Sequence, residues 1–530
     1  MTPNAITAFR LGNFKAFGDI QRIPLRPLTL IYGANSAGKS SIIHSLLLAR
    51  HGFDTGELDV YRTKIGGEAV DLGGFGQYVY QRKRNNVVEW AVELDPKQLQ
   101  LGRLSKLLES VQNLTVGITI GLGFSGFASE VDGNNQVRVE SFSLEADGQK
   151  LLNMSFCDDH KLRLNSLDYT HPLIKQVIPE SQPLIEAVIN ELAPTITTQV
   201  FRLFPESIQV NGKQLGTYEE DDKQELVQIG FWLLRLLQDL ISPITESVER
   251  EIQRLRYLGS FRSFPPRYFG LLPSQDTSWD NGGVDAWNTL LINHQVRQKV
   301  NAWLGDAKKM KTSYQLLVQD LIGSDGINAE HGKLINKSLN ENLLSEIQKM
   351  VSNLTDTDTL IDTWTHSIVE NSSERLPNLV LMDTRNQTYV SHRDVGIGVR
   401  QVIPILVYAY GSSNALVAIE QPETNLHPKL QAELGDVFIE SALGENKNNF
   451  IIETHSENLL LRIMRRMRQT FNNELPEGLL PVTPEDVSVL YIEPIGNQSV
   501  VREMPLNECG ELVEAWPGGF FEEGLEEVFS

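Results

Sequence analysis

A glycine-rich loop between two apolar runs is the feature that most constrains the fold of this chain. Residues 28–32 (LTLIY) have the composition of a buried strand, and residues 41–50 (SIIHSLLLAR) repeat apolar side chains at helical spacing. The loop between them reads GANSAGKS, and glycines in such a loop let backbone N–H groups close around phosphates at the start of a helix. The sequence therefore predicts an ATP site whose phosphates contact Asn35, Ser36, Ala37, Gly38, Lys39, Ser40 and Ser41.

A second set of polar residues follows much later in the chain. Residues 415–420 (ALVAIE) read as a buried strand that ends in Glu420, the position where phosphate-loop enzymes hold Mg²⁺ through water. Residues 448–457 (NNFIIETHSE) read as another buried strand and place His455 at its carboxyl end. We predict that Ser40 and Glu420 hold Mg²⁺ and that His455 belongs to the catalytic set.

Three further stretches allow more than one interpretation. Gln77 in DLGGFGQ is either a solvated loop residue or has the magnesium- and water-binding role that the family resemblance given below implies. Gly396 and Gly398 either form a tight turn or present a helix N-terminus to the γ-phosphate of a nucleotide held by another subunit. Arg262 and Arg267 in FRSFPPRYF either form structural salt bridges or contact a nucleotide or partner.

Composition disfavours several classes of protein. The net charge of −21 over 530 residues argues against uniform coating of nucleic acid, although basic clusters at 81–84 and 462–468 leave a local contact possible. Cys157 and Cys509 match no metal-ligand spacing and fit a reducing compartment. The N-terminus lacks a signal pattern, and no apolar run approaches the ~20 residues that span a bilayer. We expect a cytoplasmic protein without a membrane partner.

Together these motifs resemble those of ABC-type ATPases, in the branch that contains the SMC, RecF-like and overcoming-lysogenization-defect (OLD) proteins. GANSAGKS resembles Walker A, VGIGVRQ (395–401) the signature, LVAIEQPETNLHP (416–428) Walker B with the D-loop, and ETHSE (453–457) the switch-histidine segment. NFKAF (13–17) resembles the opening strand of the branch. DLGGF, YLGSFRSFPPRYF and the WPGGFFEE tail are closest to AAA-family ATPases of bacterial anti-phage defence operons, of the Septu-, PARIS- and retron-associated type.

The resemblance implies a nucleotide-sandwiched dimer or higher oligomer that uses ATP and Mg²⁺. It implies a sensor or regulatory subunit that controls a separate effector, such as a nuclease or toxin. It assigns the Q-loop role to Gln77, the signature role to Gly396 and Gly398, and the switch role to His455. No Asp-x-Asp pair follows the switch segment, so we expect no nuclease activity from the chain itself.

The chain departs from this resemblance directly after Glu420. Chromosome-maintenance ATPases have Asp-Glu in Walker B, whereas this chain has Glu420-Gln421, and a glutamine orients a water without taking its proton. We therefore predict slow hydrolysis, with Glu423 either a substitute base or a simple loop carboxylate. Two alternatives stay open: an ATP-bound scaffold that does not hydrolyse, and an OLD-like or DNA-repair ATPase that acts directly on DNA.

The predicted fold class is α/β: a discontinuous ABC-type P-loop NTPase domain, with a mixed sheet and an antiparallel lobe, interrupted by a largely helical insertion. Residues 87–94 and 140–146 alternate like antiparallel strands, whereas the pattern from about 172 to 255 is helical. The expected parts are an N-terminal half of the ATPase domain (1–155), an insertion for dimerisation or partner binding (156–375) and a C-terminal half with a short tail (376–530).

The shared-site arrangement predicts complementation between two inactive chains. Lys39→Ala removes the charge that holds the β- and γ-phosphates, and Gly398→Glu places bulk and negative charge where the neighbour's γ-phosphate would lie. Mixed dimers with one substitution in each chain should recover one working composite site, measured as ATP hydrolysis. Chains that carry both substitutions, paired with wild type, should recover none. Equal activity from both arrangements would show that each subunit hydrolyses ATP alone.

Overall fold

Contacts divide the computed structural model into two compact units, which are described separately. The first comprises residues 1–263, 278–285 and 401–530, and the second comprises residues 264–277 and 286–400. The structure describes residues 5–65, 70–99, 105, 108–123, 136–158, 161–175, 193–200, 202–210, 220–262, 283–307, 309–322 and 375–519. Among these residues, no helix has the length and apolar composition that a membrane crossing requires.

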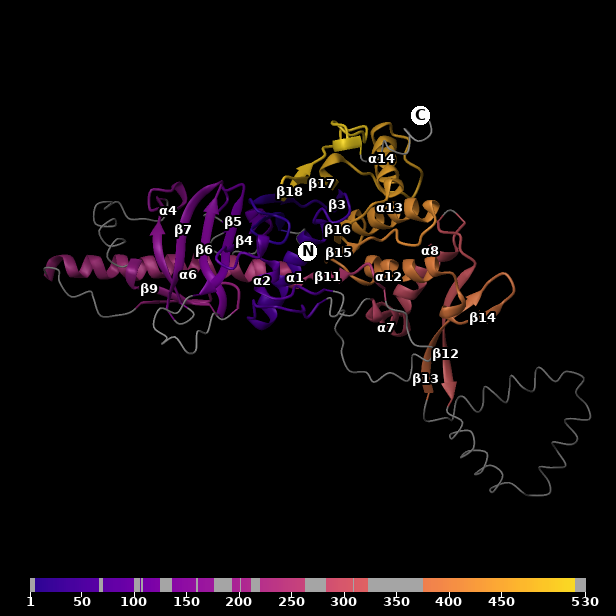
Figure 1. Ribbon diagram of the computed structural model, residues 1–530, viewed down its shortest axis with the longest axis horizontal. Helices are drawn as coiled ribbons and strands as arrows, with labels where there is room; N and C mark the ends of the chain where they lie inside the picture. Colours follow the sequence, from indigo (N-terminus) through magenta and orange to yellow (C-terminus); the bar gives the residue numbers. More distant parts are fainter. Residues whose placement is uncertain are drawn as a thin grey trace, which may run out of the picture. The chain divides into compact units, whose positions relative to one another are not determined.

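The first unit contains a six-stranded sheet (Figure 1). Its order is β11 (Leu255–Leu258), β15 (Leu416–Glu420), β16 (Asn449–Glu453), β3 (Leu28–Gly33), β17 (Val487–Ile495) and β18 (Gln498–Glu503). The first five strands are parallel, and β18 is antiparallel to β17. All residues of β3 are buried, which is typical of a parallel strand covered on both faces. Strands β15, β16 and β3 therefore end at one edge of the sheet, although they are far apart in sequence.

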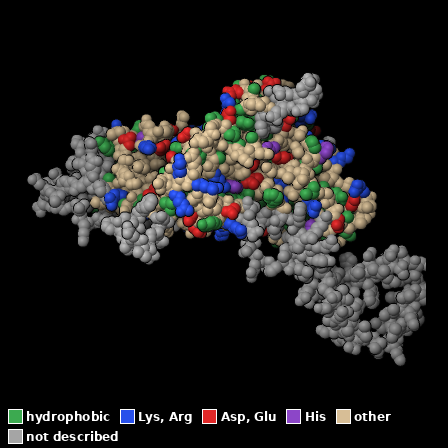
Figure 2. Space-filling model, viewed as in Figure 1, with side chains coloured by type: hydrophobic (Ala, Val, Ile, Leu, Met, Phe, Trp, Pro, Cys, Tyr) green, Lys and Arg blue, Asp and Glu red, His purple; other side chains and the backbone are tan. Residues whose placement is uncertain are grey.

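Helices pack around this sheet. They are α1 (Lys39–Thr55), α12 (Ile397–Gly411, in the first unit from Gln401 onward), α13 (Pro428–Leu443) and α14 (Glu457–Phe471). Arg466 of α14 binds Asp436 of α13 through two hydrogen bonds of 2.7 and 2.8 Å, and Arg462 binds Asp436 and Glu433. Part of the basic cluster at 462–468 is thus neutralised within the fold. On the face seen in Figure 2, acidic and basic side chains both occur, so that face is not uniformly basic.

A nine-stranded antiparallel sheet forms the rest of the first unit (Figure 1). Its order is β10 (Ser207–Val210), β9 (Ile196–Gln199), β8 (Lys161–Leu167), β7 (Gln149–Asp158), β6 (Gln136–Ala146), β5 (Leu114–Gly123), β4 (Val88–Leu94), β1 (Ile6–Gly12) and β2 (Gln21–Pro24). The apolar side chains of this sheet share one core with α1 and with the long helix α6 (Glu220–Gln253). Phe204 lies within this core and contacts the rings of Phe53, Trp90 and Phe142.

The second unit is smaller. It contains α7 (Val284–Ile292, from Ala286 onward), α8 (His294–Gly305) and a three-stranded antiparallel sheet of β12 (Tyr314–Ile322), β13 (Arg375–Asp383) and β14 (Thr388–Val390). Asn293 caps α8 by accepting hydrogen bonds from the backbone of Gln295 and Val296. Asn301 of α8 bonds to both backbone groups of Leu316, which fixes the helix to β12.

Short elements complete the described structure. They are α2 (Phe75–Tyr78), η2 (Tyr80–Arg82), η3 (Pro96–Gln98), α4 (Pro172–Lys175), η4 (Ala193–Thr195), η6 (His392–Asp394), η7 (Pro484–Asp486) and η8 (Pro517–Gly519).

The predicted α/β class is confirmed, including a mixed sheet built from both ends of the chain and an antiparallel lobe. The structure differs from the expected helical pattern within the insertion. Strands β9 and β10 form there and extend the antiparallel sheet, because their side chains pair across strands and cover the core. The described part of 156–375 thus holds strands as well as helices, and the boundaries 1–155, 156–375 and 376–530 stay predictions.

One ion cluster joins three strands at the edge of the antiparallel sheet. Glu93 on β4 is 1% exposed and accepts hydrogen bonds from Arg22 on β2 (2.8 Å to Nη2) and Arg10 on β1 (2.8 Å to Nε). Burial alone would raise the pKa of the Glu93 carboxyl, but the hydrogen bonds and charges of Arg22 and Arg10 outweigh burial and hold the pKa below its usual value of 4.5. This cluster therefore contributes to stability only while Glu93 is ionised.

Glu93→Gln should lower the free energy of unfolding near neutral pH by about 1–3 kcal/mol, because two partly exposed guanidinium groups lose their carboxylate. The folded pKa is depressed, so the contribution is complete above about pH 4.5 and is lost as pH falls through the folded pKa. Urea unfolding of wild type and variant should converge toward acid pH. Glu145→Gln is the control, because Glu145 makes one 3.4 Å contact with Arg10. A gap that stays constant with pH would contradict the assignment.

Candidate nucleotide-binding site

The phosphate loop joins the end of β3 to the start of α1. Gly38 has a φ of 101°, and a Cβ there would lie 2.6 Å from the Cβ of Ala16 in the NFKAF loop. Gly33 also has a positive φ, and a Cβ there would lie 2.7 Å from the carbonyl oxygen of Ile492. Both positions therefore require glycine, for backbone conformation and for space. This close approach holds the loop against its neighbours on two sides.

The predicted residues of the phosphate loop differ in solvent exposure. Asn35 and Ser36 are exposed, whereas Ala37 and Ser41 are buried. Lys39 is 4% exposed, and its Nζ donates hydrogen bonds to the carbonyl oxygens of Gly33 (3.1 Å) and Ala34 (2.9 Å) of the loop itself. Burial lowers the pKa of Lys39, against the opposing charges of Glu453 and Glu423.

Two carboxylates lie at the adjacent strand ends. Glu420 of β15 and Glu453 of β16 are direct partners in the parallel register. Burial and then the charge of Glu420 raise the pKa of Glu453 to about 7, against a hydrogen bond from Ser40 and the charge of Lys39. The side chain of Glu420 is 12% exposed, and its Oε1 lies 3.6 Å from Nε2 of His44. The loop, Ser40 and both carboxylates therefore meet at one edge of the sheet.

These residues suit a divalent cation. Oε1 of Glu420 and Oε2 of Glu453 are both buried without a hydrogen-bond partner, which is costly for a carboxylate and is relieved by a cation. Oxygen ligands are the type that Mg²⁺ prefers. No three His, Cys, Asp or Glu side chains in the described part of the chain form a complete metal site. A cation here would thus also use the Ser40 hydroxyl, nucleotide oxygens and water.

The sequence motifs did not reveal Glu453, Lys15 or His44 as site residues. Lys15 of the NFKAF loop has its Nζ 2.5 Å from Nδ1 of His44, and His44 follows Ser40 by one helical turn on α1. Burial lowers the pKa of Lys15 to about 8 and also lowers that of His44. Helical spacing from Ser40 was the available signal for His44, and the two strands that both end in glutamate were the available signal for Glu453.

Glu423 connects the segments that follow β15 and β16. Its Oε2 accepts a hydrogen bond from Thr454 Oγ1, and its Oε1 accepts one from the backbone N–H of His455, each at 2.7 Å. Protonation of Glu423 as a general base would weaken both bonds, because hydrogen bonds to an ionised carboxylate are stronger than those to a neutral carboxyl group. Gln421, with a φ of 43°, begins this turn and donates its backbone N–H to the carbonyl of Glu453. Burial and the charge of Lys39 lower the pKa of the half-buried His455, which places this histidine near the phosphate loop.

Arg262 bonds to the backbone at the end of β15. It is 4% exposed, and its Nη2 donates to the carbonyl oxygens of Glu420 and Gln421, both at 3.1 Å. Its Nη1 donates to the side chain of Gln401 at 3.1 Å. Burial lowers the pKa of Arg262 to about 10, against the charges of Glu423 and Glu420. Arg262 thus holds backbone carbonyls, whereas Arg267 lies outside the described residues.

The remaining predicted residues are not brought to this edge by any observed contact. Gln77 is exposed in α2. Gly396 and Gly398 belong to the second unit. A Cβ at Gly396 would meet nothing within 4 Å, so its environment is open. The roles proposed for Gln77, Gly396 and Gly398 stay predictions.

The C-terminal segment also contacts the phosphate-loop strand. The ring of Trp516 packs on Tyr32 and Tyr491, with centroids 5.4 and 5.8 Å apart. The hydroxyl of the buried Tyr32 donates a 3.1 Å hydrogen bond to the carbonyl of Ser456. Trp516 of the WPGG tail therefore supports the last residue before Gly33 and, through Tyr32, the switch segment.

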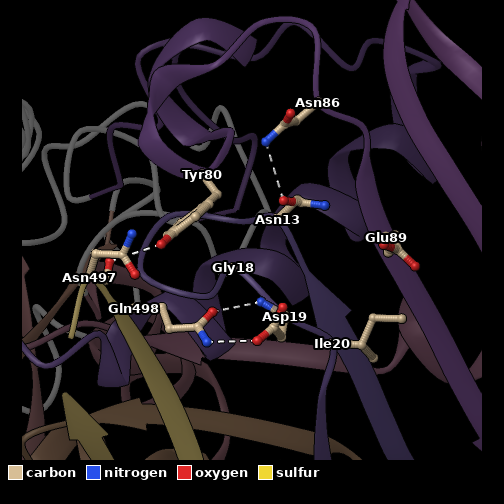
Figure 3. Close-up of a pocket in the computed structure, with 9 residues that line it drawn as sticks. All are labelled: Asn13, Gly18, Asp19, Ile20, Tyr80, Asn86, Glu89, Asn497 and Gln498. Atoms are coloured by element: carbon tan, nitrogen blue, oxygen red, sulfur yellow. Dashed lines mark hydrogen bonds between the residues drawn. The ribbon is translucent and has the colours of Figure 1, made fainter. Parts of the chain in front are cut away.

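A pocket of about 580 Å³ opens beside the NFKAF loop (Figure 3). Four amide side chains, the Tyr80 ring and the carboxylates of Asp19 and Glu89 contribute to its lining. Gln498 closes one side through two hydrogen bonds to Asp19, of 2.9 and 2.7 Å. The lining contains no lysine or arginine, so the pocket suits an uncharged or cationic polar ligand and not a phosphate.

Comparisons with known proteins identify the general class of the chain. Residues 9–177 match a family described as AAA domain, and residues 284–460 match one described as AAA ATPase domain. The first segment contains the phosphate loop, and the second contains Glu420, Glu453 and His455. Residues 482–529 match a family described as a protein of unknown function (DUF3696). No curated protein matches the chain. Two segments of the chain are thus similar to AAA-type ATPase domains, which supports the predicted ATPase class at that level.

Several solved structures are similar to the chain at low identity. One is an SMC head bound to the C-winged helix domain of ScpA, at 10% identity, covering 95% of this chain and 98% of that chain with a TM-score of 0.41. A Pyrococcus furiosus SMC head bound to the C-terminal domain of ScpA has 10% identity, coverage of 99% and 100%, and a TM-score of 0.36. The Thermotoga maritima SMC head has 7% identity, coverage of 95% and 100%, and a TM-score of 0.33. The chain's own strand order and pairing define its α/β fold.

Arg262→Lys should destabilise the strand end, because an ammonium group cannot reach Gln401 and both carbonyls in the planar geometry of a guanidinium. The free energy of unfolding should fall by about 1.5–3 kcal/mol, the range for hydrogen bonds to a charged group. Urea unfolding measures this change. The control is Arg250→Lys on the exposed side of α6, which should change stability little. Equal effects from both variants would show that the contacts of Arg262 contribute nothing.

Proposed function

We propose that the chain binds ATP and Mg²⁺ and hydrolyses ATP slowly. The observation that carries the proposal is the meeting of Lys39, Ser40, Glu420 and Glu453 at one sheet edge. A lysine and backbone N–H groups suit the phosphates, and the two acids and a hydroxyl suit the cation. When bound, Mg²⁺ neutralises negative charge on the phosphate oxygens.

In this proposal each residue of the site has a separate task. Lys39 exchanges its bonds to Gly33 and Ala34 for the β- and γ-phosphates. Gln421 orients the attacking water, and His455, held by Glu423 through its backbone N–H, lies toward the γ-phosphate. Hydrolysis is slow because Gln421 cannot take a proton and because protonation of Glu423 would weaken its hydrogen bonds to Thr454 and His455.

The proposed biological role rests on the sequence resemblance. In it the ATP-bound chain is a cytoplasmic sensor that associates with itself and restrains or releases a separate effector, such as a nuclease, in anti-phage defence. Slow turnover supports this role, because a long-lived ATP-bound state suits a regulatory subunit. Co-purification with the product of the neighbouring gene, followed by native mass spectrometry, tests the partner and the stoichiometry together.

A second candidate is an ATP-bound scaffold without hydrolysis. Gln421 favours it because a glutamine cannot accept a proton, and Glu423 favours it because its carboxylate links two segments through hydrogen bonds that protonation would weaken. The two candidates share the ATP site and differ only in turnover.

Single-turnover phosphate release at saturating Mg²⁺ and ATP separates the candidates. Wild type should release phosphate slowly, and Gln421→Glu should accelerate release by about 10²- to 10⁴-fold, the usual contribution of a general base. Lys39→Ala is the control that should lose ATP binding while remaining folded. ATP binding without release in wild type would establish the scaffold. Unchanged ATP affinity in folded Lys39→Ala would overturn the site itself.

A further inference from the structure

Glu453 is a buried acidic residue near the phosphate loop with one unsatisfied carboxylate oxygen. The residue is 4% exposed, and its Oε2 has no hydrogen-bond partner. Burying a carboxylate oxygen without a partner is unfavourable by several kcal/mol unless a charge or a ligand compensates it. A purely structural role would provide that compensation within the folded chain.

Among the described residues, the basic side chains nearby do not donate hydrogen bonds to the Glu453 carboxylate. Lys39 donates its hydrogen bonds to two loop carbonyls, and Lys15 lies against His44. Arg262 donates to carbonyl oxygens and to the side chain of Gln401. Each nearby cation is therefore bonded to a group other than the Glu453 carboxylate.

Glu420 adds a second acidic side chain beside Glu453. Glu420 is the register partner of Glu453, and its Oε1 is also buried without a hydrogen-bond partner. Two like charges on adjacent parallel strands repel each other, and the parallel register prevents either from moving away along its strand. Ser40 lies in the first turn of α1, which follows the phosphate loop at the end of β3, the strand paired with β16, so its hydroxyl is a further oxygen at this edge.

We propose that Glu453 is a direct ligand of the divalent cation, together with Ser40 and Glu420, and that this site binds the cation before the nucleotide arrives. The inference rests on the proposed nucleotide site and adds a second protein carboxylate to it. A site with two carboxylates attracts a divalent cation more strongly than a site with one. Nucleotide-independent cation binding is therefore the property that distinguishes this chain's site from one that depends on nucleotide oxygens.

The test is a titration of the purified full-length chain with Mn²⁺ in the absence of nucleotide, followed by the electron paramagnetic resonance signal of free Mn²⁺. Wild type should bind one equivalent, and Glu453→Gln should weaken binding roughly tenfold or more, since even outer-shell changes weaken metal sites by 10- to 100-fold. The control is Glu457→Gln, which removes the same charge from an exposed position at the start of α14 and should bind like wild type.

Thermal unfolding gives a second readout. Glu453→Gln should raise the melting temperature of the cation-free protein, because it removes the repulsion from Glu420, and should abolish the further rise that Mn²⁺ gives to wild type. A merely structural Glu453 would instead show a lower melting temperature in the variant and an unchanged response to Mn²⁺. Should Glu453→Gln fail to fold, Glu453→Asp keeps the charge on a shorter side chain and should still weaken Mn²⁺ binding.

Equal Mn²⁺ affinity in wild type and in a folded Glu453 variant would overturn the inference, as would absence of Mn²⁺ binding to nucleotide-free wild type. ATP binding, measured separately, tests the proposed function. Mn²⁺ binding without ATP binding would overturn the proposed function and keep the cation site. ATP binding to a protein that does not bind Mn²⁺ without nucleotide would overturn the cation-site inference and keep the proposed function.

Discussion

The parallel pairing of β15, β16 and β3 is the constraint on which the site depends. Neighbouring strands lie about 4.8 Å apart, so residues in register at their carboxyl ends cannot avoid one another. Glu420 pairs with Glu453, and Glu453 pairs with Ile31, two residues before Gly33. The register that places the acids beside the phosphate loop therefore also forces two carboxylates together. The same strand register thus creates both a place suited to a divalent cation and the repulsion between the two carboxylates.

The basic residues near this edge hold backbone in place and leave the acids largely uncompensated. Lys39 bonds to loop carbonyls, and Arg262 bonds to the carbonyls of Glu420 and Gln421. A lysine or arginine side chain that bonds to carbonyl oxygens fixes the path of the backbone, whereas one that bonded to Glu453 would neutralise its carboxylate. This distribution explains why burial and Glu420 together raise the pKa of Glu453 despite the nearby lysine. The protein thus keeps two largely buried acidic side chains beside a loop suited to phosphate.

Local pattern was sufficient to predict the strand, loop and helix around Lys39 and the two later strands that end in acidic segments. These elements are specified by contiguous residues, and each has a clear apolar run. Local pattern was not sufficient to predict the contributions of Glu453 and Arg262. The position of Glu453 depends on strand register, and that of Arg262 depends on a close approach between segments far apart in the sequence. The strands β9 and β10 were missed for a related reason: four residues are too few to show a period, and only pairing within the sheet identifies them.

Glu423 shows why the type and spacing of a residue do not settle its chemistry. By sequence it stands two residues after Gln421 and is a reasonable substitute base. In the fold its two oxygens bind Thr454 and the backbone of His455, so proton transfer to it would weaken the link between the turn after β15 and the switch segment. Its carboxylate is more useful as a fixed acceptor than as a base. The slow hydrolysis that we propose would follow from the arrangement of the whole edge. In that proposal Glu423 holds the switch segment, Glu420 and Glu453 bind the cation, and Gln421 orients water but cannot accept its proton.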